Sequence, residues 1–215
     1  MSESVYDLVI LGAGSGGYAA ALRASQLGLK VALIEGDKVG GTCLHRGCIP
    51  TKAYLHAAET ADTVRESDTF GIQASFQGID MAKVGQYRDS IINKLYRGVQ
   101  GLLSSRGVDV IQGWGRLASP DTIEVGGQRI VGRNIILATG SYSRSIPGLD
   151  ISGRIITSDQ ALQMEWVPQK AVVLGGGVIG LEFASVWRSF GAEVTIIEEL
   201  HHLANNEDEA VSKHL

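Results

Sequence analysis

Hydrophobic and polar positions along this chain form two stretches with the same order. Residues 7–35, "DLVILGAGSGGYAAALRASQLGLKVALIE", begin with an apolar run, continue with an amphipathic pattern that Gly28 stops, and end in a second apolar run. Residues 170–198, "KAVVLGGGVIGLEFASVWRSFGAEVTIIE", repeat this order without a gap, and here Gly191 ends the amphipathic part. A short, β-branched apolar run is typical of a buried parallel strand. Each stretch therefore predicts a strand–helix–strand unit.

The chain between these units predicts two long helices and then short strands. Apolar residues at helical spacing indicate helices over 50–68 and 81–107. Three apolar runs indicate strands, the middle one turning through Gly126 and Gly127: 108–119, 121–131 and 133–141. Residues 141–162 indicate a crossing between domains, since Pro147 and Gly148 interrupt them. We predict an α/β fold with two Rossmann-like βαβ units, in domains 1–148 and 149–215.

Both units carry the pattern G-x-G-x-x-G between their first strand and their helix. The first glycine allows a tight turn, the second lets the backbone approach a pyrophosphate, and the third lets helix and strand pack closely. Glu35 and Glu198 end the second strands, roughly 20 residues after the glycines, where an acid can bind an adenosine ribose. Glycine turns that only pack helix on strand are the alternative, but strand, helix and acid agree in both copies. Six glycines form the two predicted dinucleotide sites: Gly12, Gly14, Gly17, Gly175, Gly177 and Gly180.

Composition narrows the class of protein further. The 215 residues have a formal net charge of −4 with interspersed signs, which argues against a nucleic-acid surface. No apolar run has the length of a membrane span, and "MSESVY" lacks the basic start of a signal peptide. We expect a cytoplasmic protein without a membrane partner. Structural disulfides are rare in the cytosol, so two closely spaced cysteines favour catalysis or metal binding.

Both cysteines, Cys43 and Cys48, lie in "GGTCLHRGCIPTK", residues 40–52. A structural zinc site needs four ligands in paired short spacings, which His45 and His56 do not supply, so we predict no metal. Two inert buried thiols are the other alternative.

The residues that follow the cysteines favour redox chemistry. Pro50 suits the first turn of a helix, which would place Cys48 at the helix N-terminus, where the dipole and N–H groups stabilise a thiolate. Lys52 adds a positive charge one turn along. A disulfide between the two cysteines would close only a short loop and so add little stability, which suits a bond that opens and closes.

This stretch resembles the redox-active disulfide motif of the pyridine nucleotide–disulfide oxidoreductases. Within that family it is most similar to the dihydrolipoamide dehydrogenase branch, usually spelled GGxCLNxGCIPSK, because Leu44 and Ile49 stand where other relatives tend to carry valine. The chain differs from that spelling at His45 and Thr51, and Arg46 lies beside His45 in the loop between the cysteines.

The resemblance implies a role for each matching residue. Cys43 and Cys48 would form the redox-active disulfide, and Glu182 would pair with Lys52 beside a flavin. The first unit would bind FAD and the second NAD, and an acid at Glu198 favours NAD over NADP. The FAD contacts implied by the family motifs, beyond the first three glycines and Glu35, are Gly41, Thr42, Lys52, Gly115, Thr139, Gly140 and Ser141.

The resemblance also implies a reaction and partners. Dihydrolipoamide on the acyltransferase of a 2-oxo acid dehydrogenase complex would reduce the disulfide at Cys43, and Cys48 would pass the electrons to FAD and then NAD. Family chains are about twice this long and carry a dimerisation domain with an acid/base histidine, which none of the five histidines here matches. We therefore expect an N-terminal portion of a homodimeric enzyme, inactive alone. Two alternatives stay open: another disulfide reductase of this superfamily, mercuric or glutathione-type, and a flavin-binding module without turnover.

Overall fold

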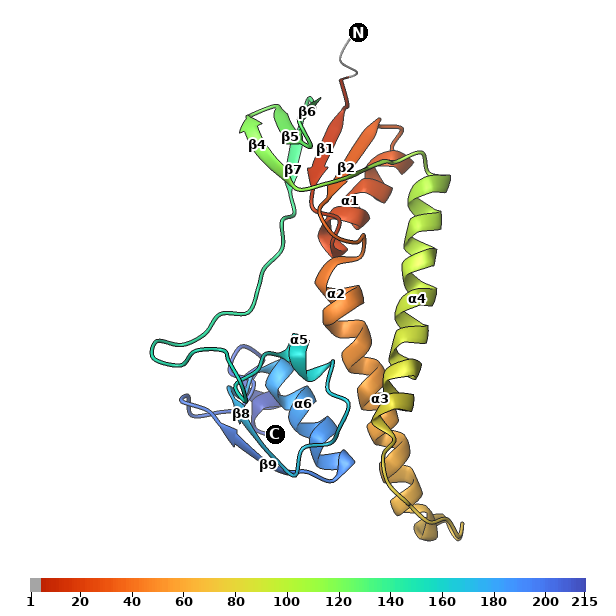
Figure 1. The fold of residues 1–215 in the computed structure, drawn as a ribbon, viewed down its shortest axis with the longest axis vertical. Coiled ribbons are helices and arrows are strands. Elements are labelled where there is room, and N and C mark those ends of the chain that lie inside the picture. Colours follow the sequence, from red (N-terminus) through yellow and green to blue (C-terminus); the bar gives the residue numbers. More distant parts are fainter. Residues whose placement is uncertain (1–4) are drawn as a thin grey trace. The chain divides into compact units, whose positions relative to one another are not determined.

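The computed structural model describes residues 5–215, drawn as a ribbon in Figure 1. Contacts divide the chain into two compact units. The first unit is the chain up to Ile49 with Ile91–Gly148, and the second is Pro50–Ser90 with Leu149–Leu215. The predicted division at 148/149 matches one point of this grouping, whereas residues 50–90 group with the second unit. The domain boundary therefore stays a prediction.

A four-stranded parallel sheet forms the centre of the first unit. Its order is β3 (Asp109–Gln112), β2 (Val31–Glu35), β1 (Leu8–Leu11) and β7 (Ile135–Leu137), and every neighbouring pair is parallel. Helix α1 (Ser15–Gln26) connects β1 to β2. Because β1 and β2 are apolar at every position up to Ile34, both faces of the sheet can be buried. The first predicted βαβ unit is confirmed.

The two faces of this sheet pack against different elements. On one face, Ile10 and Leu33 pack with Ala21 of α1 and with Leu103 of α4 (Met81–Ser105). On the other face, the alternate strand residues pack with Ile123 of an antiparallel sheet of β4 (Gly115–Ser119), β5 (Thr122–Val125) and β6 (Gln128–Val131). The turn predicted at Gly126 and Gly127 joins β5 to β6, and both glycines have positive φ. Strands β1 and β2 are thus covered on both sides, whereas most residues of β3 and β7 are exposed.

The two long helices are also confirmed. Helix α3 (Cys48–Arg65) begins two residues before the predicted start, one residue after the end of α2 (Gly41–Arg46), and a 3₁₀ turn, η1 (Ser67–Phe70), follows it. Helix α4 covers most of the second prediction. No helix in residues 5–215 is long and apolar enough to cross a membrane.

The second unit contains the repeat of the βαβ pattern. Strands β8 (Lys170–Leu174) and β9 (Glu193–Ile197) pair in parallel, and α6 (Val178–Phe190) connects them. Helix α6 packs its aromatic residues onto α3, where Phe190 lies 6.5 Å from Tyr54 between ring centroids. Two short helices of the same unit lie on either side of this repeat along the chain: α5 (Ser158–Ala161) before β8 and α7 (Glu209–Ser212) after β9. The second predicted βαβ unit is confirmed.

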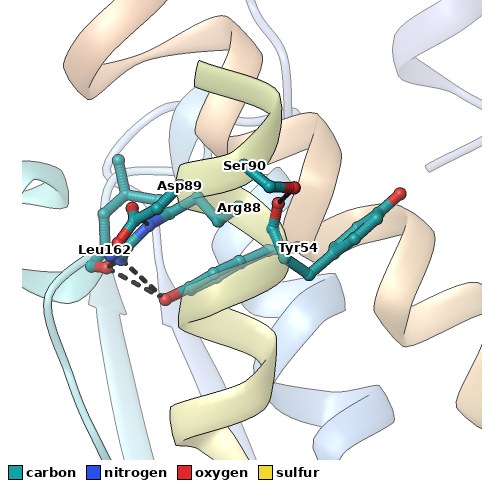
Figure 2. Close-up of polar contacts among 6 residues, drawn as sticks. Tyr54, Arg88, Asp89, Ser90 and Leu162 are labelled. Atoms are coloured by element: carbon teal, nitrogen blue, oxygen red, sulfur yellow. Dashed lines mark hydrogen bonds and ion pairs between the residues drawn. The ribbon is translucent and has the colours of Figure 1, made fainter. Parts of the chain in front are cut away.

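Arg88 of α4 is buried in the second unit, where it binds Tyr54 and the backbone of Leu162, as Figure 2 shows. Its guanidinium donates to the Tyr54 hydroxyl at 3.0 Å and to the Leu162 carbonyl, and its Nε donates to Asp89 at 2.8 Å. The Tyr54 hydroxyl donates to the same carbonyl at 2.9 Å. Burial of the ring raises the pKa of Tyr54. These bonds join α3, α4 and the segment before β8 at one point.

Candidate functional site

The first glycine turn lies at the carboxyl end of β1 and leads into α1. Gly12 has φ +99°, and a Cβ at this position would lie 2.2 Å from the carbonyl oxygen of Ala138. A Cβ on Gly17 would lie 1.8 Å from the Gly12 carbonyl oxygen. Both positions therefore require glycine, and the turn packs directly against the residue that precedes Thr139, Gly140 and Ser141. These three predicted cofactor residues are all exposed beside the turn.

No side chain in the described part of the chain caps α1, whose N-cap is Gly14. A Cβ on Gly14 would make only an ordinary contact, 3.9 Å from Gly41. The first N–H groups of a helix need acceptors, and phosphate oxygens are suitable ones. The turn therefore fits the pyrophosphate of a dinucleotide.

The acid at the end of the second strand bonds to the glycine turn in both repeats. In the first, Glu35 accepts from the N–H of Ala13 at 2.7 Å and from that of Asp37 at 2.8 Å. In the second, Glu198 accepts from the N–H of Gly176 at 2.6 Å and from that of Leu200 at 2.9 Å.

These backbone donors lower the pKa of Glu198 and favour its carboxylate form. The two βαβ repeats thus share the bonds between acid and glycine turn as well as their sequence pattern.

The second glycine turn repeats the first in its backbone. Gly175 has φ +101°, and a Cβ on Gly180 would lie 2.2 Å from its carbonyl oxygen. Gly177 is the N-cap of α6, and a Cβ there would meet nothing within 4 Å. This turn, too, leaves space for a phosphate at the start of its helix.

The cysteine stretch begins on the first glycine turn. The N–H of Gly40 donates to the Ala13 carbonyl at 2.7 Å. Gly41 has φ +57°, and a Cβ there would lie 2.6 Å from the Cα of Gly14. Thr42, which follows, is exposed. The backbone of this stretch therefore lies in contact with the predicted pyrophosphate site.

The two cysteines lie on consecutive helices. Cys43 belongs to α2 and is partly exposed, whereas Cys48 is exposed and is the first residue of α3. Gly47 joins the helices, and a Cβ there would lie 3.4 Å from the Cα of Cys43. The prediction that Cys48 begins a helix with Pro50 in its first turn is confirmed. The two cysteines are not joined by a disulfide bond in this structure, so the bond between them stays a prediction.

Lys52, one turn after Cys48 on α3, forms an ion pair with Glu182 of α6. The Nζ–Oε1 distance is 2.5 Å, and the glutamate side chain is 19% exposed. The family resemblance implies this pairing.

His45, one of the departures from the family spelling, contacts other residues of the first unit. Its Nε2 lies 2.9 Å from the Val39 carbonyl oxygen, and its ring contacts Tyr96 edge-on at 5.1 Å between centroids. Arg46 is exposed and Thr51 is buried. His45 therefore helps to hold the cysteine stretch.

Several residues of this site gave no signal in the sequence. The N–H groups of Ala13 and Gly176 bind the two acids, and the Ala138 carbonyl abuts the first turn, yet all are backbone groups that any residue type could supply. Gly115 was predicted from the resemblance, and a Cβ there would lie 2.7 Å from Leu11. Within residues 5–215 no three His, Cys, Asp or Glu side chains gather as they would around a metal ion.

The fold and the site define an α/β protein of the dinucleotide-binding type, with two glycine turns and a cysteine pair beside the first. Residues 6–215 match the family model described as pyridine nucleotide-disulphide oxidoreductase. The chain belongs to this family.

The chain is similar to curated proteins named dihydrolipoyl dehydrogenase. It is 44% identical over 224 residues to the one from Bacillus subtilis (strain 168), covering 98% of this chain and 47% of the relative. It is 42% identical to the one from Acholeplasma laidlawii, covering 96% of this chain and 63% of the relative. The chain thus spans about half the length of most of the curated relatives it matches.

Solved structures show the same fold. The HOCl-induced flavoprotein disulfide reductase RclA from Escherichia coli aligns with a TM-score of 0.79 at 30% identity, covering 97% of this chain and 45% of that one. Its Cu(II) complex aligns with a TM-score of 0.78.

Proposed function

We propose that this chain is the FAD-binding and disulfide-bearing part of a dihydrolipoyl dehydrogenase, with NAD as the electron acceptor. The observation that supports the proposal is the contact between Gly41 and Gly14, which joins the start of the cysteine stretch to the first glycine turn. Disulfide chemistry beside a bound dinucleotide is what such an enzyme requires. The curated relatives with this name support the lipoamide substrate.

The residues present fit two dinucleotides with different roles. The first turn, with Glu35, would hold the pyrophosphate and ribose of FAD, because only this turn has the cysteine stretch against it. The second turn, with Glu198, would hold NAD. A carboxylate at this position repels the 2′-phosphate of NADP, which supports NAD as the nucleotide.

The two cysteines divide the thiol–disulfide exchange between them. A thiolate of dihydrolipoamide attacks one sulfur of the disulfide, which forms a mixed disulfide and releases the other cysteine as a thiolate. The second thiolate of dihydrolipoamide then attacks the lipoyl sulfur of this mixed disulfide and displaces the first cysteine, so lipoamide leaves with both cysteines reduced. We assign the attacked sulfur to Cys43. Cys48, the first residue of α3, would be the sulfur that passes the electrons on to FAD. FAD, when bound, supplies two-electron transfer between this dithiol and the nicotinamide.

Glu182 keeps the ammonium of Lys52 in a fixed position on α3. The lysine side chain is 59% exposed, so the ion pair contributes little to stability. Its role is to position the positive charge of Lys52. By relation to the same family we also propose a homodimer that serves the lipoyl-bearing acyltransferase of a 2-oxo acid dehydrogenase complex, in the cytoplasm.

Substrate comparison on the full-length protein tests the proposal. We expect bound FAD, and reduction of NAD by dihydrolipoamide with a kcat/KM far above that for NADP. Glutathione disulfide and mercuric ion, offered with NADPH, should give little turnover. Faster turnover with either of them would assign the protein to another disulfide reductase, and bound FAD without any turnover would make it a flavin-binding module.

A further inference from the structure

Trp114 is an exposed tryptophan directly after the end of a central strand. It follows β3 by two residues and is 83% exposed, more than any other tryptophan in the described residues. A large apolar ring in water carries a cost that burial against a ligand removes. The exposure of this indole is therefore best explained by a ligand that covers the ring in the first unit.

One face of the indole lies on the backbone of Gly36. A Cβ on Gly36 would lie 2.6 Å from Cδ2 and 2.8 Å from both Cε2 and Cε3 of Trp114. The φ of Gly36 is outside the left-handed region, so its backbone conformation does not require glycine. The missing side chain instead leaves the space that the indole occupies. Gly36 and Trp114 thus form a matched small–large pair.

This pair lies beside the acid that would bind the adenosine ribose. Gly36 directly follows Glu35 at the carboxyl end of β2, and Gln112 at the end of β3 donates to the Asp37 carbonyl at 2.8 Å. Ligands of parallel α/β sheets bind outside the carboxyl ends of the strands. In the strand order β3-β2-β1-β7, a dinucleotide whose pyrophosphate lies at β1 and whose ribose lies at β2 extends toward β3.

We propose that the indole of Trp114 is the platform on which the adenine of the first-unit dinucleotide stacks. This inference rests on the proposed function, because it assumes a dinucleotide in the first turn. One face of the indole packs on Gly36 and the ring is otherwise exposed, so a purine next to the ribose can cover it. Stacking on an aromatic ring recognises adenine by its π-face and adds specificity for FAD over flavins that lack adenine.

Nucleotide binding to the deflavinated full-length protein tests this role. Trp114→Leu should raise the Kd for FAD roughly 10-fold, the effect of losing one base–aromatic stack. The Kd for FMN, which has no adenine, should stay unchanged, and Trp114→Phe should keep most of the FAD affinity. Trp166→Leu is the matched control, since Trp166 is also exposed, at 64%, and lies in the second unit. ADP should quench tryptophan fluorescence in the wild type and less in Trp114→Phe.

A substitution at Gly36 tests the pair itself. Gly36→Ala should weaken FAD binding by displacing the indole, and it should have little further effect in the Trp114→Leu background. An unchanged FAD affinity in folded Trp114→Leu, with normal FAD content in the wild type, would overturn this inference and leave the proposed function intact. Failure of the wild type to take up any FAD would overturn the proposed function as well.

Discussion

The contact between the cysteine stretch and the first glycine turn predicts that one methyl group added at Gly41 lowers the stability of the protein and its FAD content. Gly41→Ala adds a Cβ that would lie 2.6 Å from the Cα of Gly14, inside van der Waals contact with rigid backbone. The substitution also places an alanine at φ +57°. Two separate costs therefore act at this position, one from the backbone conformation and one from the clash.

Gly28→Ala measures the first cost alone. Gly28 has φ +81° in the same unit, and a Cβ there would meet nothing within 4 Å. A left-handed alanine costs about 1–2 kcal/mol, which the loss of unfolded-state freedom partly offsets by about 0.4–1 kcal/mol. Overpacking at Gly41 adds about 1–3 kcal/mol. We expect a loss of about 1 kcal/mol for Gly28→Ala and about 3 kcal/mol for Gly41→Ala.

Urea unfolding of the two variants checks this difference. A gap of about 2 kcal/mol corresponds to midpoints that differ by roughly 1 M. Gly41→Ala should also lose FAD content, because the backbone of Gly14 has to move, whereas Gly28→Ala should keep it. Equal midpoints and equal flavin content for the two variants would refute the contact between the cysteine stretch and the turn.

Three further predictions concern the polar contacts. Tyr54→Phe should lower the free energy of unfolding by about 1–2 kcal/mol in urea titrations, since Arg88 loses one partner but keeps the Leu162 carbonyl. Glu182→Gln should change that free energy by less than about 1 kcal/mol, because the ion pair is partly exposed, yet stopped-flow absorbance should show slower flavin reduction by dihydrolipoamide. Glu198 has a lowered pKa, so its carboxylate stabilises the fold at neutral pH and this contribution is lost as the pH falls below the ordinary glutamate value. The stability gap between wild type and Glu198→Gln should therefore shrink toward zero below about pH 4.

The repeated units and their glycine turns could be predicted from the sequence because local signals agree there. Apolar strands, glycine spacing and a terminal acid all point to one geometry, and Gly12 and Gly17 prove sterically necessary in it. The start of α3 at Cys48 followed from a single proline at its first turn.

Contacts between distant segments could not be predicted in this way. Arg88 lies in a polar helical stretch and would be expected in solvent. Its burial depends on the Tyr54 hydroxyl and the Leu162 carbonyl, which only the folded chain brings to it. The contact between Trp114 and Gly36 likewise joins residues at two strand ends, and neither residue type predicts that contact.

A count of reactive thiols before and after reduction by NADH tests the central claim most directly. If Cys43 and Cys48 exchange electrons with a bound flavin, anaerobic NADH should convert one disulfide into two thiols per chain of the full-length FAD-loaded protein. A thiol reagent added after removal of NADH should then find two more reactive groups than before. Cys43→Ser and Cys48→Ser should show no increase. An unchanged count in the wild type, with flavin bound and NADH consumed, would contradict a redox role for the cysteine pair.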